Sequence, residues 1–216
     1  LLYGLQNGIN VIDTAQKYRN GRSEKLIGKV LQKLMTHQDF KRENLFISTK
    51  AGLLSESIIN SNFLSHLGLK QDQINLSQKF CMEGKYIDWS VDKALEVMKL
   101  DYIDAFLLHN PEIVYLSNDG EKKLLQCLEI LEQKSLEGKI RNYGIASWNG
   151  LRRNPGSVLH IDIISILDKL KDRLGEEINF KIIEAPLSIG MPSVLSYRSA
   201  KKNNLSFRDL LKKYDL

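Results

Sequence analysis

The chain has 216 residues, of which 43% are hydrophobic and 26% charged, a composition typical of a globular protein and not of a disordered one. Its formal charge of +5 comes from basic and acidic residues that are interspersed, so nucleic acid is not an expected partner. No apolar run reaches the roughly 18 residues that cross a bilayer, so we expect no membrane contact. Cys81 and Cys127 lie far apart and outside metal-binding spacings, which favours a cytoplasmic protein with reduced thiols and no bound metal.

Short β-branched runs alternate with longer helical patterns along the chain, which is the signature of βαβ units on a parallel sheet. The expected strands, in chain order, are residues 10–14, 45–50, 102–109, 142–147 and 180–189. The expected helices are residues 23–34, 90–100, 120–137, 161–173 and 207–214. All of these elements are expected to belong to one domain, residues 1–216.

Two of the expected helices show a distinct apolar stripe. In residues 23–34, Ser23 is the expected N-cap, because a serine side chain can accept a hydrogen bond from the first turn. The buried face of this helix is expected to comprise Leu26, Ile27, Val30 and Leu31. The helix at 120–137 is expected to bury Leu124, Leu125, Leu128, Leu131 and Leu136, and to stop at Gly138.

The number of strands does not settle the architecture. Right-handed βαβ crossovers build either a (β/α)8 barrel, which typically needs about 250 residues, or an open doubly wound sheet. Both architectures remain possible from the pattern alone.

Polar side chains follow the first three expected strands. Asp13 and Tyr18 follow the first strand, Lys50 the second and His109 the third. The carboxyl ends of parallel strands converge on one face, where active sites are built, so these four side chains are expected to meet. Taken singly, each has an ordinary explanation, such as a turn cap for the aspartate or a rim contact for the tyrosine.

Together, the four residue types form a recognisable acid site. A phenol has an ordinary pKa near 10 and protonates a carbonyl oxygen poorly at neutral pH unless a neighbour stabilises its phenolate. Lys50 would supply that stabilisation for Tyr18, and Asp13 would keep the lysine charged and positioned. His109 could hydrogen-bond the substrate oxygen and orient it.

Three segments resemble motifs of the aldo-keto reductases. GINVIDTAQKYRNGRSEKLIGKVL resembles the family signature, in which Asp and Tyr lie five residues apart, here Asp13 and Tyr18. ENLFISTKAG resembles the segment with the catalytic lysine, here Lys50, and DYIDAFLLHNPE the segment with the catalytic histidine, here His109. The LHNPE motif and the long insertion after Lys50 resemble those of the family branch that contains aldose and galactose dehydrogenases.

The resemblance implies an α/β (β/α)8 TIM barrel and a metal-free oxidoreductase that uses NADP(H), or else NAD(H). It implies that hydride passes between the nicotinamide and a carbonyl carbon of a small-molecule carbonyl or sugar while the tyrosine acts as general acid. The family's Ser-Asn pair for the nicotinamide carboxamide falls on Ala146 and Ser147, and its glutamine falls on Glu184. The cofactor contacts implied here are therefore Asp13, Ser147 and Glu184, with a hydroxyl and a carboxylate in place of two amides.

The two ends of the chain also depart from the family pattern. The chain begins with what resembles the tail of the family's first helix, so the first strand is expected to be missing, as are the last two βα units with the adenosine phosphate site. We therefore expect an incomplete barrel, a fragment whose own activity can be nil. The alternative is a non-catalytic regulatory or binding relative with the same barrel, which the complete set of four residues disfavours. The oligomeric state is not predicted.

Overall fold

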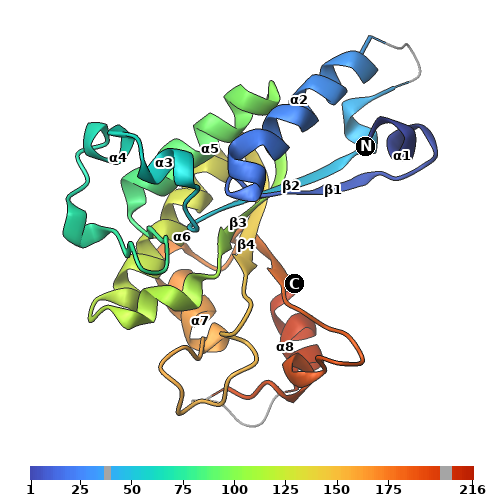
Figure 1. Cartoon of the computed structure of the whole chain (residues 1–216). Helices are drawn as coiled ribbons and strands as arrows, with labels where there is room; N and C mark the ends of the chain where they lie inside the picture. Colours follow the sequence, from blue (N-terminus) through green and yellow to red (C-terminus); the bar gives the residue numbers. More distant parts are fainter. Residues whose placement is uncertain (37–39, 200–205) are drawn as a thin grey trace.

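A computed structural model of the chain describes residues 1–36, 40–199 and 206–216. Its centre is a five-stranded sheet in which each strand pairs in parallel with the next one along the chain. The strands are β1 (Val11–Asp13), β2 (Phe46–Ala51), β3 (Ile103–His109), β4 (Ile140–Ala146) and β5 (Phe180–Glu184). Figure 1 shows them crossing the middle of the molecule.

The strand order distinguishes the two architectures that the sequence left open. A doubly wound sheet reverses its strand order at a switch point. The order here is β1-β2-β3-β4-β5 without a reversal, as in the strands of a (β/α)8 barrel, each of which lies beside its successor. The sheet is therefore an arc of a barrel wall.

The helices follow the strands around the outside of this arc. They are α1 (Leu2–Gln6), α2 (Arg22–Leu34), α3 (Glu56–Ile59), α4 (Phe63–His66), α5 (Gly84–Met98), α6 (Gly120–Leu136), α7 (Ile163–Leu174) and α8 (Phe207–Tyr214). The 3-10 helices are η1 (Tyr18–Gly21), η2 (Arg42–Asn44), η3 (Gln71–Gln73), η4 (Pro111–Leu116) and η5 (Ser193–Ser196). Helix α2 contacts α5, α5 contacts α6, and α6 contacts α7 (Figure 1).

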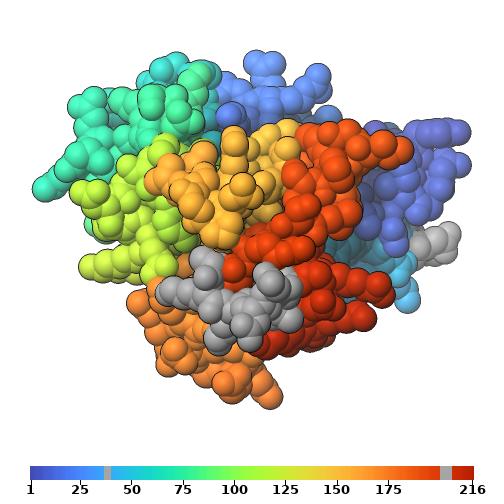
Figure 2. Space-filling model, turned by 90° about the horizontal axis from the view of Figure 1, so that it is seen from below, coloured from blue at the N-terminus to red at the C-terminus, as the bar shows by residue number. Residues whose placement is uncertain are grey.

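Helix α8 packs against α7, where Tyr214 donates a hydrogen bond to Asp168 over 2.7 Å. Figure 2 shows the orange α7 segment and the red α8 segment in contact at the lower end of the molecule. Among the described residues, no helix combines the length and the hydropathy that a bilayer crossing requires.

All five expected strands and all five expected helices are present, most with bounds within two residues of the prediction, but two differ by more. Strand β5 ends at Glu184 and not at residue 189. Helix α5 begins at Gly84, six residues earlier than predicted, after Glu83, which makes no side-chain capping hydrogen bond. The insertion between β2 and α5 contains the short helices α3 and α4 and the 3-10 helix η3.

The predicted face of α2 is partly wrong. Leu26 is 50% exposed, because the buried stripe runs through Glu24, Ile27, Gly28 and Leu31. Gly28 fixes this orientation, since a Cβ atom there would lie 2.7 Å from the carbonyl oxygen of Val97 in α5.

Two further predictions about helix residues are also wrong. Ser23 is not the N-cap of α2, because Gly21 occupies that position in a left-handed conformation and the Ser23 hydroxyl instead accepts a hydrogen bond from Thr14. Leu136 is 77% exposed, because it is the last residue of α6 before the turn at Gly138.

Candidate active site

The register of the sheet brings three of the expected site residues to one face. Asp13 lies beside Ser48, and Lys50 follows two residues later in β2 and lies beside Leu107. Successive strand residues point to opposite faces, so Asp13, Ser48 and Lys50 share a face. His109 extends this face in β3, two residues after Leu107. All three residues therefore lie at the carboxyl edge of the sheet.

Lys50 is the buried centre of this cluster, with a relative exposure of 1%. Its ammonium group donates to both carboxylate oxygens of Asp13, over 2.6 and 2.5 Å, and to the carbonyl oxygen of Thr14 over 3.1 Å. A second carboxylate, that of Glu184, lies 3.2 Å from the same nitrogen. Burying an ammonium is costly unless it is paired, and these contacts offset that cost for Lys50.

Tyr18 lies over the lysine at the start of η1. The Lys50 ammonium nitrogen is 5.6 Å from the centroid of the Tyr18 ring, and this ring meets the His109 imidazole edge to face, with centroids 5.9 Å apart. The side chain is 39% exposed, and its hydroxyl makes no hydrogen bond in the part of the chain that the structure describes. The phenol therefore remains available to a ligand.

The backbone after Tyr18 adopts an unusual conformation. Arg19, Asn20 and Gly21 follow each other with φ angles of 50°, 59° and 81°, a left-handed run that is unfavourable for residues with a Cβ atom. The Asn20 side chain accepts a hydrogen bond from the backbone of Ser57 over 2.9 Å. Such strain persists where surrounding contacts hold it, often at functional sites, and here it fixes the loop that carries Tyr18.

His109 is the fourth member of the cluster and is neutral at physiological pH. Its pKa is lowered to about 4, mainly by burial and also by the nearby charges of Lys50 and Lys17, whereas the charge of Asp13 opposes this shift. Its buried Nδ1 has no hydrogen-bond partner among the described residues. The imidazole also borders a cavity, where its ring can meet a ligand.

A cavity of about 180 Å³ opens above these residues. It is lined by Tyr18, His109, Asn110, Ala146, Ser147, Trp148, Glu184, Ala185 and Pro186. The cavity thus joins the carboxyl ends of β3, β4 and β5 to the tyrosine loop, and Trp148, which is 53% exposed, stands at its rim. All expected site residues except Lys50 and Asp13, which lie beneath Tyr18, border this cavity.

The expected cofactor residue Ser147 is buried and already engaged. Its hydroxyl donates to the carboxylate of Glu112 over 3.0 Å, and the same carboxylate accepts the backbone N–H of Asn149 over 2.6 Å. Glu112, which is 1% exposed, was not predicted as a site residue. The only signal in the sequence is its position three residues after His109.

The expected cofactor residue Glu184 lies at the end of β5 and faces Lys50. Burial raises the pKa of its carboxyl group, the negative charge of Asp13 raises it further, and Lys50 lowers it. Lys50 therefore lies between the carboxylates of Asp13 and Glu184, and both interact with its ammonium group.

Comparison with known proteins places the chain in a family. The model of the Aldo/keto reductase family matches residues 1–153, so the chain belongs to this family. Curated relatives include the NADH-specific methylglyoxal reductase of Escherichia coli, 30% identical over 65% of this chain, and the D-arabinose 1-dehydrogenase of Saccharomyces cerevisiae, 29% identical over 68%. The L-galactose dehydrogenase of Arabidopsis thaliana is 28% identical over 64% of the chain. The predicted likeness to the aldose and galactose dehydrogenases is confirmed.

The matched regions cover less than half of each relative's own length. The chain spans 37% of the methylglyoxal reductase and 35% of the D-arabinose dehydrogenase. Among solved structures, an aldo-keto reductase from Bacillus halodurans in its holo form superposes with a TM-score of 0.57 and 24% identity, covering 86% of this chain and 46% of that one. This likeness confirms the predicted barrel-type fold, of which the chain forms a part.

Proposed function

We propose that the protein is an oxidoreductase that interconverts a carbonyl compound and an alcohol with a nicotinamide cofactor, and that residues 1–216 belong to its single barrel domain. The observation that carries the proposal is the buried Lys50 ammonium, held by Asp13 and lying against the Tyr18 ring. A phenol needs such a neighbour to act as a general acid near neutral pH.

The roles of the chain's own residues follow from this geometry. The Tyr18 hydroxyl donates a proton to the oxygen of the bound carbonyl compound, and the charge of Lys50 stabilises the phenolate that results. Asp13 keeps the lysine charged and fixed. The neutral imidazole of His109 hydrogen-bonds the same oxygen and orients it. In the reverse direction, the Tyr18 phenolate removes the proton of the alcohol.

The residues of the cavity fit the nicotinamide end of the cofactor. The Glu184 carboxylate can accept hydrogen bonds from the carboxamide nitrogen, and the flat indole of Trp148 borders the cavity. Ser147 would bind through the lone pairs of its hydroxyl, since its proton is donated to Glu112. When bound, the cofactor supplies or accepts the hydride. NADP(H) is the proposed form, and the printed name of the NADH-specific relative keeps NAD(H) as the second choice.

The substrate class proposed is a small aldehyde, ketone or aldose. The printed names of the relatives include a methylglyoxal reductase and dehydrogenases of D-arabinose, L-galactose and D-threo-aldoses. A small cavity with one histidine and one tyrosine at its floor fits the carbonyl end of such compounds.

A titration of both cofactors tests the proposal. NADPH and NADH fluorescence is followed while the 216-residue chain, and separately the full-length protein, is added. The full-length protein is expected to bind one of the cofactors and to reduce methylglyoxal or oxidise an aldose. Failure to bind NADPH and failure to bind NADH, both together, would contradict the proposal.

The second candidate is a non-catalytic relative that keeps the barrel. One relative, 25% identical over 66% of this chain, is named a putative voltage-gated potassium channel subunit beta of Schizosaccharomyces pombe. Cofactor binding without turnover of any carbonyl compound or aldose would favour this candidate. Turnover that depends on Tyr18 would exclude it.

A further inference from the structure

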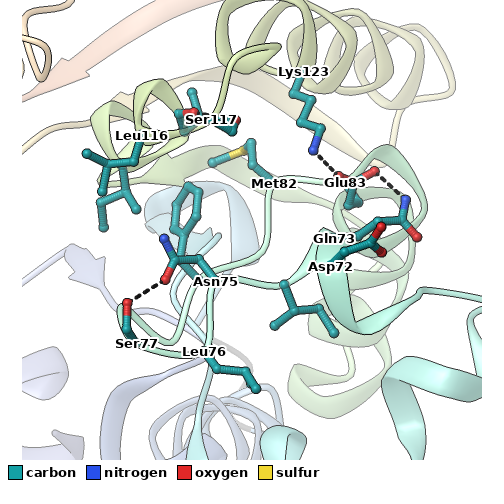
Figure 3. Close-up of a pocket in the computed structure, with 14 residues that line it drawn as sticks. Asp72, Gln73, Asn75, Leu76, Ser77, Met82, Glu83, Leu116, Ser117 and Lys123 are labelled. Atoms are coloured by element: carbon teal, nitrogen blue, oxygen red, sulfur yellow. Dashed lines mark hydrogen bonds and ion pairs between the residues drawn. The ribbon is translucent and has the colours of Figure 1, made fainter.

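A second cavity lies outside the candidate active site. It has a volume of about 410 Å³, and its walls come from the insertion after β2 on one side and from η4 and the start of α6 on the other (Figure 3). The lining residues are Asp72, Gln73, Ile74, Asn75, Leu76, Ser77, Phe80, Met82, Glu83, Ile113, Val114, Leu116, Ser117 and Lys123. This volume falls in the range of small-molecule sites.

The cavity has a fixed apolar floor. Phe80 and Met82 are each only 3% exposed, and Phe80 exchanges two backbone hydrogen bonds of 2.9 Å with Asn75. Residues 75–80 therefore form a closed turn whose shape does not depend on a ligand. Ile74 and Ile113 add apolar atoms from the two opposite walls.

The polar groups of the rim offer both donors and acceptors. The Asn75 side-chain oxygen accepts from the Ser77 hydroxyl over 2.8 Å and from the Gln78 backbone over 3.0 Å, which leaves its NH2 group as a donor. The Ser117 hydroxyl donates to the Val114 carbonyl over 2.7 Å, which leaves its lone pairs as acceptors. Within the described part of the chain, the Asp72 carboxylate has no hydrogen bond or ion pair.

The charges of the cavity select against anions. Glu83 is balanced by Lys123, 2.8 Å away, and also accepts from the Gln73 amide over 3.0 Å, as Figure 3 shows. Asp72 is then the one charge on the described lining without a partner. A ligand with a carboxylate or phosphate would meet this negative charge, whereas a hydroxyl group can donate to it.

We propose that this cavity is a binding site for a neutral polyhydroxy compound of about monosaccharide size. Each hydroxyl of such a ligand donates and accepts at once, which matches the mixture of the Asn75 amide, the Ser117 oxygen and the Asp72 carboxylate. The C–H face of the ligand lies on the apolar floor. The site is separate from the candidate active site, and its existence does not depend on the proposed function.

The 3-10 helix η4 separates the two cavities. Asn110, just before η4, lines the catalytic cavity, and Glu112 holds Ser147 there. Ile113 and Val114, the next two residues, line the second cavity, which we call the outer cavity. A ligand in the outer cavity therefore contacts the segment whose other side supports the candidate active site, and the two sites can be told apart residue by residue.

The test uses methyl β-D-glucopyranoside as the probe, because its blocked anomeric carbon can be neither oxidised to a lactone nor reduced. Amide NMR spectra of the 15N-labelled full chain are recorded during a titration with this glycoside, and separately with the anionic methyl β-D-glucuronide. We expect saturable shifts at Asn75, Phe80 and Ser117 with the neutral glycoside, and weaker binding of the anion.

Two substitutions sharpen this test. Asn75→Asp keeps the acceptor for Ser77 and Gln78 but removes the NH2 donor, so the affinity for the neutral glycoside should fall on the order of tenfold. Asp72→Asn removes the negative charge and should abolish the discrimination against the glucuronide. Asp101→Asn, an exposed residue before β3, makes the same change in charge outside the cavity and should alter neither titration.

Three results would overturn the proposal. The first is the absence of saturable shifts around the outer cavity in the wild-type chain. The second is equal affinity for the neutral and the anionic glycoside. The third is a set of shifts confined to Ala146 and Trp148, which would place the glycoside in the catalytic cavity.

Discussion

The two ends of the sheet each hold a cluster of charges around a buried ion, and the clusters differ in what they leave free. At the amino end, both oxygens of the Asp104 carboxylate are occupied by Arg42 over 2.6 Å, by the Ile47 backbone over 2.9 Å and by Arg141 over 3.4 Å. The two guanidinium groups also enclose the Tyr102 ring, at 4.2 and 4.0 Å. This cluster is tied to three neighbouring strands and has the form of a structural clamp.

The cluster at the carboxyl end differs in that it borders a cavity. Lys50 is fully paired, whereas the Tyr18 hydroxyl makes no hydrogen bond among the described residues, and Tyr18 and His109 line this cavity. At the amino end, Arg42 Nε and the Tyr102 hydroxyl also lack partners among the described residues, but these two atoms are buried, whereas the Tyr18 side chain is 39% exposed. The comparison therefore favours a structural role for the amino end and a ligand-binding role for the carboxyl end.

The largest effect is expected from Tyr18→Phe. Loss of a general acid typically costs about 10²- to 10⁴-fold in rate, so kcat for carbonyl reduction should fall by that order, as measured by NADPH oxidation. The thermal unfolding temperature should not change, because the hydroxyl supports no contact among the described residues. Tyr3→Phe removes the same hydroxyl from a side chain that is 79% exposed and serves as the control. Equal loss in both variants would contradict the assignment.

Asp104→Ala tests the amino end. Removing one partner of a buried ion pair leaves the other charge uncompensated and costs about 3–5 kcal/mol. The free energy of unfolding, measured in urea, should fall by that amount, while kcat per folded molecule stays close to that of the wild type. Asp101→Ala, at an exposed position nearby, should have little effect. A stable Asp104→Ala variant with impaired turnover would reverse the comparison of the two ends.

Glu184→Gln is expected to change the pH profile more than the maximal rate. The pKa of Glu184 is raised, so as the pH rises through it a second negative charge appears beside Lys50. That charge disfavours a phenolate at Tyr18, and reduction by the wild-type protein should slow severalfold over this pH interval. The glutamine variant should lack this decline in kcat. Identical pH profiles would show that Glu184 does not act on the tyrosine through Lys50.

The smallest effect concerns Glu24, which is buried between α2 and β2 and accepts a hydrogen bond from Thr49 over 2.6 Å. Burial raises its pKa. Its protonated form therefore contributes stability below the unfolded-state pKa, and this contribution is lost as the pH rises through the folded-state pKa. Glu24→Gln keeps the acceptor without the charge, so at neutral pH it should be more stable than the wild type by on the order of 1 kcal/mol.

The advantage of Glu24→Gln should disappear in acid buffer below the ordinary pKa of a glutamate. Urea unfolding of both proteins at the two pH values measures this difference. A stability difference that does not depend on pH would contradict a raised pKa of Glu24 in the folded protein.

The strands and most helices could be predicted because their apolar periodicity is local. The first six residues of α5 were missed because no capping side chain precedes Gly84. The exposure of Leu26 could not be foreseen, because it depends on the close approach of Gly28 to Val97 in a different helix. Tertiary packing decided this face of α2, not the periodicity of its sequence.

The candidate site was predictable to a similar degree. Asp13, Tyr18, Lys50 and His109 stand at strand ends, and a parallel sheet brings such positions together, as the structure shows. Glu112 was missed because its contact partner, Ser147, is 35 residues away. The pairing of Glu184 with Lys50 requires three intervening strand registers, which the sequence does not reveal.

Direct hydride transfer is the most decisive test of the catalytic assignment. The protein is incubated with NADPH deuterated at C4 of the nicotinamide and with methylglyoxal, and the alcohol product is analysed by mass spectrometry. We predict one deuterium at the new alcohol carbon with the wild type and a nearly complete loss of labelled product with Tyr18→Phe and Lys50→Met. Labelled product formed equally well by these variants would contradict the role of Tyr18 and Lys50.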